Sequence, residues 1–231
     1  MKLHFLGTGA ADWDITKTSR DINYRRFSSL LIDNILLVDP GPCVFEFAET
    51  FGYRKLTQDI RYIVNTHRHG DHYDSKTVEK LCENGAKFYV AERGAPITAG
   101  EYTIAAYEAN HGTCIDANHI AVGDKAGKRL FYACDGSWFT YKTYLGICSY
   151  KPDMLIFDCT VGDIEGDYRI FEHNNIRMVL EMAMTLRQYC GSFMVSHMAR
   201  TLHGSHGELC ERLAPYGIIP AHDDMVVQIS D

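Results

Sequence analysis

Short apolar runs, each bounded by polar or turn-forming residues, recur from one end of the chain to the other. Runs of about four to eight such residues predict β-strands that are buried on one or both faces. The predicted strands cover residues 3–6, 29–32, 35–38, 62–64, 87–90, 129–133, 154–157, 193–195 and 225–229.

A second pattern, with apolar residues three and four positions apart, predicts helices. It is clearest in the segment that contains Ile176, Val179, Leu180 and Ala183, and shorter candidates cover residues 44–51, 75–82 and 205–213. Strands come first and later alternate with helices, which predicts an α/β domain with helices outside its sheets. We expect one domain over residues 1–231.

Composition and charge narrow the class of partner. Hydrophobic residues make up 46% of the 231 residues, enough for a substantial core, and the formal net charge is −7. Because proteins that bind nucleic acids usually present a basic surface, this charge argues against a large RNA or DNA partner. It does not argue against a small anionic substrate held by metal ions.

The cysteines and the apolar runs bear on location. None of the eight cysteines forms a Cys-x-x-Cys pair, so buried free thiols in a reducing compartment are expected. The first residues lack the apolar core of a signal peptide, and no apolar stretch is long enough to span a bilayer. We therefore expect a cytoplasmic protein without a membrane partner.

The strongest chemical signal follows the predicted strand 62–64. There the chain reads His67-Arg68-His69-Gly70-Asp71-His72, with four residues of metal-ligand type in six positions. Two histidines two positions apart in extended chain point the same way and can hold one ion. Gly70 then allows a turn that presents Asp71 and His72 to a second ion. Mixed imidazole and carboxylate ligands suit zinc or manganese.

This His-x-His-x-Asp-His sequence after a strand resembles the signature of the metallo-β-lactamase superfamily. The resemblance implies a four-layer αββα sandwich, in which two mixed sheets pack together with helices outside. It also implies three further ligands after later strands: His111, Asp135 and His197. By resemblance, His67, His69 and His111 hold one ion, Asp71, His72 and His197 hold the other, and Asp135 bridges them.

Two positions stay open. Cys134 could replace Asp135 as a ligand, because alternation along a strand allows only one of two neighbours to reach the metals. His222 follows a late strand and is a reserve ligand. We expect His4 in a strand and His119 in a loop, without a special role.

Two further segments resemble the phosphodiesterase branch of the superfamily. They are Arg25-Arg26-Phe27-Ser28-Ser29-Leu30-Leu31-Ile32 and Leu155-Ile156-Phe157-Asp158-Cys159-Thr160, the latter followed by Glu172-His173-Asn174-Asn175. The branch contains a cyclic-phosphate phosphodiesterase of phosphonate breakdown, which is the nearer likeness, and the tRNA 3′-processing endonuclease, which is more distant. The resemblance implies that His173 protonates the leaving group and that Asp158 orients it. The resemblance also allows a homodimer, but no residue pattern in the sequence indicates one.

The expected activity is hydrolysis of a small, linear or cyclic phosphodiester by a hydroxide that bridges two divalent ions. Asp71 is expected to steer that hydroxide, Asp39 to support a metal-binding histidine, and Thr8 to line the substrate pocket. The main alternative is a lactonase or thioesterase on the same dinuclear site, which does not need the pair His173 and Asp158. A di-iron oxidoreductase and a non-catalytic metal-binding protein are further alternatives.

Overall fold

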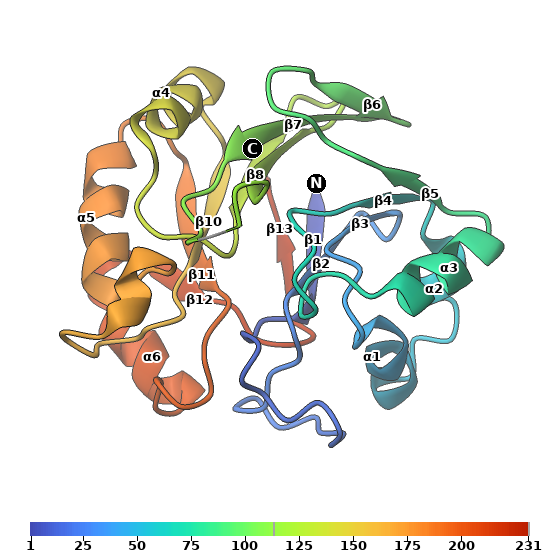
Figure 1. Cartoon of the computed structure of the whole chain (residues 1–231), viewed down its shortest axis with the longest axis horizontal. Helices are drawn as coiled ribbons and strands as arrows, with labels where there is room; N and C mark the ends of the chain where they lie inside the picture. Colours follow the sequence, from blue (N-terminus) through green and yellow to red (C-terminus); the bar gives the residue numbers. More distant parts are fainter. Residues whose placement is uncertain (113, 231) are drawn as a thin grey trace.

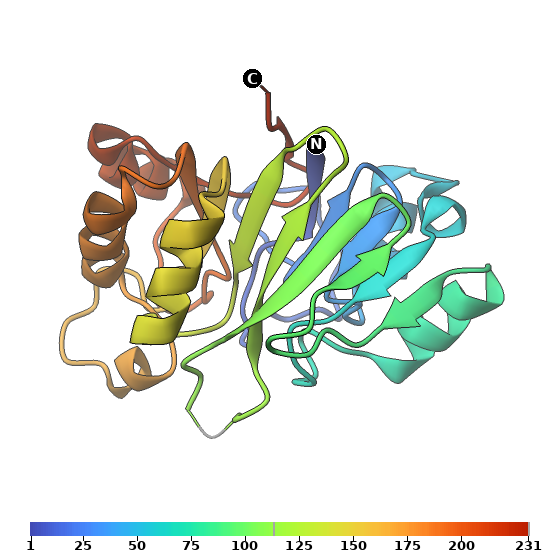
Figure 2. The same cartoon turned by 90° about the horizontal axis from the view of Figure 1, so that it is seen from above.

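Two β-sheets pack face to face in the middle of the molecule, and helices cover the outer face of each sheet (Figures 1 and 2). The computed structural model describes residues 1–112 and 114–230, so the expected domain boundary at residue 231 lies outside it. This arrangement confirms the expected α/β architecture with two mixed sheets and helices outside.

The first sheet has six strands and is built from the N-terminal part of the chain and one C-terminal strand. β1 and β2, like β2 and β3, are antiparallel, whereas β3, β4 and β5 run parallel. Their order in the sheet is β13 (Val226–Gln228), β1 (Lys2–Gly7), β2 (Ser29–Ile32), β3 (Leu36–Val38), β4 (Tyr62–Val64) and β5 (Lys87–Tyr89).

The second sheet has seven strands. β9 to β12 run parallel, and β6 to β9 pair antiparallel. The order is β12 (Ile218–Pro220), β11 (Ser192–Ser196), β10 (Met154–Asp158), β9 (Arg129–Ala133), β8 (Asn118–Gly123), β7 (Tyr102–Glu108) and β6 (Ile97–Ala99).

Each sheet has its own set of helices. The six-stranded sheet is covered by α1 (Val44–Phe51), α2 (Leu56–Asp59) and α3 (Ser75–Glu83), and the other sheet by α4 (Tyr141–Tyr150), α5 (Ile176–Leu186) and α6 (His206–Leu213) (Figure 1). Two short 3₁₀ turns, η1 (Tyr168–Phe171) and η2 (Ala214–Tyr216), flank α5 and α6. In the described part of the chain, no helix has the length and apolar character needed to cross a membrane.

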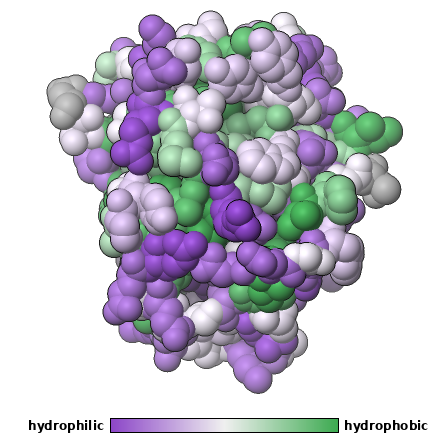
Figure 3. Space-filling view, turned by 90° about the vertical axis from the view of Figure 1, so that its left-hand side faces the viewer, coloured by the Kyte–Doolittle hydropathy of each residue, from purple (hydrophilic) through white to green (hydrophobic). Residues whose placement is uncertain are grey.

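The strand sequences explain the layers. Along β9, Leu130 and Tyr132 face the core between the sheets, whereas Phe131 and Ala133 face the helices. Neighbouring residues of a strand point to opposite faces, so a wholly apolar strand predicts burial on both sides. The outer side of the helices that cover the seven-stranded sheet is mostly hydrophilic, with scattered hydrophobic patches (Figure 3). Leu145 on α4 and Met184 on α5 are exposed hydrophobic residues.

The structure adds elements that the apolar pattern does not predict: β6, β7, β8, α2 and α4. In α4, the aromatic and β-branched residues are weak helix formers, and the helix begins because the Thr140 hydroxyl accepts a hydrogen bond from the Thr143 amide. Gly146 is required there, since a Cβ atom would lie 2.3 Å from the Tyr107 ring. His119 is not a loop residue as expected, because it lies fully buried within β8.

Parallel strands of a sheet end at the same edge, and this edge collects most of the predicted site residues. Asp39 follows β3, His67 follows β4, Asp135 follows β9 and His197 follows β11, while Asp158 ends β10. Open α/β architectures place their binding residues at such strand ends.

Candidate metal centre

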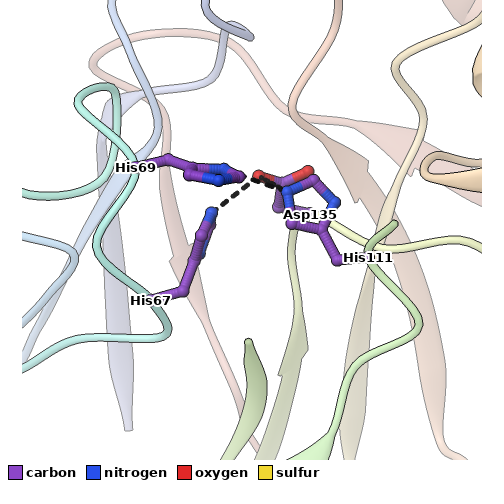
Figure 4. A group of neighbouring side chains, drawn as sticks. All are labelled: His67, His69, His111 and Asp135. Carbon is purple, nitrogen blue, oxygen red and sulfur yellow. Dashed lines mark hydrogen bonds and ion pairs between the residues drawn. The ribbon is translucent and has the colours of Figure 1, made fainter. Parts of the chain in front are cut away.

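The loop after β4 and two loops of the seven-stranded sheet bring four side chains together. Figure 4 shows His67, His69, His111 and Asp135 pointing toward one another. The carboxylate oxygen Oδ2 of Asp135 lies 3.1 Å from Nε2 of His67 and 3.3 Å from Nε2 of His111. Nδ1 of His69 lies 3.1 Å from Nε2 of His111. The four ligand atoms lie within 4.8 Å of one another.

A second group shares Asp135 with the first. It contains Asp71, His72 and His197, with its four ligand atoms again within 4.8 Å of one another. Nε2 of His72 lies 3.3 Å from Oδ2 of Asp135 and 3.1 Å from Nε2 of His197. Oδ2 of Asp71 lies 3.4 Å from Nε2 of His197. The two groups are therefore adjacent sites with one carboxylate between them.

In three of the candidate ligands, the contact made by Nδ1 shows that Nε2 faces the other ligands. Nδ1 of His72 lies 2.8 Å from Oδ2 of Asp39, and Nδ1 of His111 lies 3.2 Å from the Glu172 carbonyl. Nδ1 of His197 lies 2.8 Å from the Thr160 hydroxyl. A histidine that donates from Nδ1 keeps a lone pair on Nε2, which is how histidines in metal sites are oriented.

These lone pairs fit divalent cations. The inner nitrogens of His72 and His197 face each other at 3.1 Å, and Nε2 of His67 is buried without a hydrogen-bond partner among the described residues. Lone pairs so close repel one another unless a proton or a metal ion lies between them. The residues present thus suit the binding of divalent metal ions.

Burial and neighbouring charges set the electrostatics of the site. Burial alone would raise the pKa of Asp135, but the surrounding histidines hold it well below its ordinary value. Burial likewise opposes the charged form of His72, but the carboxylates of Asp71 and Asp39 outweigh it and raise its pKa well above the ordinary value. Burial lowers the pKa of His67 and of His111.

His173 stands beside these two groups and forms a third cluster with Asp135, Asp158 and His197. Its Nδ1 lies 2.9 Å from Oδ2 of Asp158 and 2.9 Å from Oδ1 of Asp135. Burial would lower its pKa, but these two carboxylates raise it to about 11. Nδ1 thus donates a hydrogen bond to Asp158 and lies at ion-pair distance from Asp135.

A cavity of about 280 Å³ opens over the two ligand groups. Besides His69, Asp71, His111, Asp135 and His197, its walls contain residues outside the two groups: Ala10, Ala11, Asp12, Thr160, Arg169, Glu172, His173 and Ala199. The candidate ligands thus lie at the floor of a space that a small molecule can enter.

Three residues of the site have a left-handed backbone. The φ angles are 61° at Asp39, 61° at Asp135 and 62° at His197. Such φ angles are uncommon for residues other than glycine and cost energy, and they cluster at functional sites. Here they turn the chain sharply just after a strand.

The structure brings the predicted site residues together, with the exception of Thr8. Its hydroxyl donates to Asp223 at 2.9 Å and accepts from Arg25 at 2.8 Å, so it does not reach the cavity. The two open positions also lie elsewhere. Cys134 points into the core between the sheets. His222 packs against His206, outside both ligand groups.

Several residues at the site were missed from the sequence. The Thr160 hydroxyl contacts His197, and the Thr66 hydroxyl lies 3.0 Å from Nδ1 of His67. Thr160 could have been found, because it lies two positions after Asp158 at the same strand end. Arg169 and Glu172 lie in a loop without periodicity, and no sequence signal marks them.

No protein-family model matches the sequence, and no curated protein sequence matches it. Solved structures do resemble it. A diphosphatase from the PhnP family has a TM-score of 0.73 at 19% identity, covering 98% of this chain and 97% of its own. The metallo-β-lactamase fold protein YhfI from Bacillus subtilis has a TM-score of 0.70 at 18% identity, covering 98% of each chain. Unliganded yeast PDE1 has a TM-score of 0.66 at 9% identity, covering 97% of this chain and 98% of its own. At these identities the likeness establishes the fold, and the chain has the metallo-β-lactamase fold.

Proposed function

We propose that this protein is a dinuclear metal-dependent phosphodiesterase that hydrolyses a small, linear or cyclic phosphodiester. The observation that carries the proposal is the placement of His173. Its Nδ1 is held by Asp158 and Asp135, and its ring borders the cavity above the two ligand groups. Hydrolysis of an ester with a poor leaving group requires a proton donor at this place.

Two divalent ions, zinc or manganese, would neutralise charge on the diester and supply a hydroxide at neutral pH, because metal binding lowers the pKa of water toward about 7. His67, His69 and His111 would hold one ion, and Asp71, His72 and His197 the other. Asp135, which faces both groups, would fix their spacing, and Asp71 would steer the attacking water.

The protein's own contribution to bond cleavage is a proton at Nε2 of His173. Because Nδ1 donates to a carboxylate, Nε2 is the nitrogen that remains for the substrate. It would deliver its proton to the departing oxygen, and general acid catalysis of this kind contributes about 10²- to 10⁴-fold. Acyl hydrolysis by a metal site needs no such residue, so the pair favours a phosphodiester over a lactone or thioester.

The similar structures support hydrolysis of a phosphate compound in general, without indicating the substrate. One of them is a diphosphatase by its description, so a protein with this fold acts on phosphoric anhydrides. Eight free cysteines, four of them buried, suit a reducing compartment and support a cytoplasmic location.

The test compares His173→Ala on two substrates with the zinc- or manganese-loaded protein. On an alkyl diester, kcat should fall about 10²- to 10⁴-fold. On bis(p-nitrophenyl) phosphate the loss should be much smaller, since nitrophenolate leaves without a proton. Asp135→Ala serves as the blank, and His222→Ala, outside the cavity, is the matched histidine control.

Equal losses on both substrates would refute the role of His173. Failure of the wild-type protein to cleave any diester, while it holds two ions and cleaves a lactone or thioester, would replace the proposed function with carbonyl-ester hydrolysis.

A further inference from the structure

The 3₁₀ turn η1, directly before His173, presents two kinds of side chain. Arg169 and Glu172 line the cavity over the ligand groups. Tyr168 and Phe171 are 77% and 74% exposed. A 3₁₀ turn has three residues per turn, so residues i and i+3 lie on the same side. The turn therefore has one polar side toward the cavity and one aromatic side next to it.

Arg169 is the only arginine or lysine among the described residues that line this cavity. Its Nε and Nη2 donate to the Asp167 carboxylate at 2.8 Å and 2.6 Å, and no described residue accepts a hydrogen bond from Nη1. Asp167 also accepts the Arg169 amide at 2.9 Å, which fixes the carboxylate. One edge of the guanidinium is thus held in place and the remaining donors are available to an anion, for which arginine is well suited.

The turn is fixed relative to the proposed proton donor. The amide of His173 donates to the Arg169 carbonyl at 2.7 Å, and the Ser137 hydroxyl donates to the Ile170 carbonyl at 2.5 Å. Ser137 follows the turn that carries Asp135. A molecule bound by this turn therefore has a fixed position relative to His173 and Asp135, and such positioning favours catalysis.

The aromatic side begins at the edge of the cavity. The Arg169 guanidinium carbon lies 5.8 Å from the centre of the Tyr168 ring. The Tyr168 ring is therefore next to the arginine that lines the cavity. Tyr168 and Phe171 both leave apolar surface in water, and each directly precedes a residue that lines the cavity, Arg169 and Glu172. Flat ring systems stack on such side chains with little dependence on their identity.

We propose that the turn from Tyr168 to Glu172 recognises a phosphodiester that carries a nucleobase. Arg169 binds a phosphate oxygen, and the side formed by Tyr168 and Phe171 stacks on the base. The proposal rests on the proposed function and adds its substrate class, a small nucleotide diester.

The experiment uses two esters with the same leaving group and the zinc-loaded full chain. One is the p-nitrophenyl ester of thymidine 5′-phosphate, and the other is the same ester with hydrogen in place of thymine. We expect kcat/KM of the wild type to favour the thymidine ester by about tenfold or more, as stacking of one base contributes.

Three variants separate the contacts. The double variant Tyr168→Ser, Phe171→Ser should lose the preference for the thymidine ester, so that its kcat/KM values on the two esters become equal within about twofold. Arg169→Gln should lower kcat/KM about tenfold or more on both esters, because the phosphate is common to them. Tyr141→Ser, which removes an aromatic side chain that is 74% exposed on α4 away from the cavity, should change neither value.

Equal kcat/KM for the two esters in the wild type, or a preference that persists in the double variant, overturns the proposal. Calorimetric binding of AMP and of ribose 5-phosphate decides the case in which neither ester is cleaved. Preferred binding of AMP that disappears in the double variant would support base recognition while the phosphodiesterase function fails. Equal binding of the two would refute base recognition itself.

Discussion

A single carboxylate orients histidines of both ligand groups. Oδ2 of Asp39 contacts Nδ1 of His72, while Oδ1 accepts hydrogen bonds from the amide and the hydroxyl of Thr66 at 2.7 Å and 2.9 Å. The Thr66 hydroxyl in turn contacts His67. Asp39, fully buried, thus sets the ring orientation on the two sides of Asp135. Partners of this kind commonly affect metal affinity about 10- to 100-fold.

His119 is a buried residue whose hydrogen-bonding capacity is not satisfied. It is fully buried in β8, and neither ring nitrogen has a hydrogen-bond partner among the described residues. Burial lowers its pKa to about 3. The ring is therefore neutral in the folded protein at all pH values above that.

We expect His119→Leu to raise the free energy of unfolding by about 1 kcal/mol at pH 7, because an unsatisfied buried donor is removed. The gain should grow as the pH falls from about 6.5 toward 3. In that window the unfolded histidine binds a proton that the folded one does not, which costs the wild type up to about 1.4 kcal/mol per pH unit. Urea unfolding of both metal-free proteins at pH 7, 6 and 5 measures this, and parallel pH slopes would contradict it.

At the residue scale, the sequence predicts the site residues that belong to one local motif. It misses the residues that only tertiary contacts bring to the site. His67, His69, Asp71 and His72 come from one strand end, so their proximity follows from local geometry. Arg169 reaches the same cavity from a segment about a hundred residues away, and only the path of the loop between β10 and α5 brings it there.

At the scale of elements, α5 connects stability with the site. The Asn175 side chain caps the helix by accepting a hydrogen bond from the Met178 amide, and His173 lies two residues earlier. The neighbouring Asn174 donates to the Gly136 carbonyl at 2.8 Å, and its amide contacts Asp158. The start of the helix is therefore part of the support of the proposed proton donor.

Asn175→Ala should lower the free energy of unfolding by about 1 kcal/mol, as the loss of a cap does. It should also lower kcat on an alkyl diester severalfold, since His173 becomes less well positioned. Ser205→Ala is the matched control: it removes the cap of α6 at similar cost, but α6 is not attached to His173. Equal effects of the two substitutions on kcat would refute the connection.

Elements with strong periodicity agree closely with the sequence analysis, and those without it do not. The helix at 44–51 and the strands at 29–32 and 129–133 have the predicted bounds. β7 has two alanines in succession, and β8 contains a histidine and ends in glycine, so their preference for a strand comes from pairing with each other. Tertiary context of this kind overrides local propensity.

At the scale of the whole molecule, the candidate centre joins the two halves of the fold. His67, His69, Asp71 and His72 belong to the half with the six-stranded sheet, whereas His111, Asp135 and His197 belong to the other. Ions held by both sets bind the folded chain and not the unfolded one. Their binding free energy therefore adds to the stability of the native state.

Chelation should lower the melting temperature by about 10 °C, since ligand at a thousandfold excess over its Kd contributes about 4 kcal/mol. The shift should largely disappear in Asp135→Asn, which weakens both groups. Asp224→Asn changes an aspartate with a similar left-handed backbone, φ 65°, outside the site, and should keep the full shift. Scanning calorimetry with and without chelator measures it, and an unchanged shift in Asp135→Asn would contradict the bridging role.

The left-handed backbone at Asp39, Asp135 and His197 has a consequence for mutational tolerance. In a library that varies these three positions, a clone must first accept the left-handed backbone to fold, and must then carry the right side chains to be active. Asparagine and glycine accept the conformation, so they should accumulate among folded but inactive clones. Valine and isoleucine, which resist it, should be lost at the level of expression. Sorting clones first by abundance and then by turnover would therefore separate the demands of the chain's path from those of the reaction.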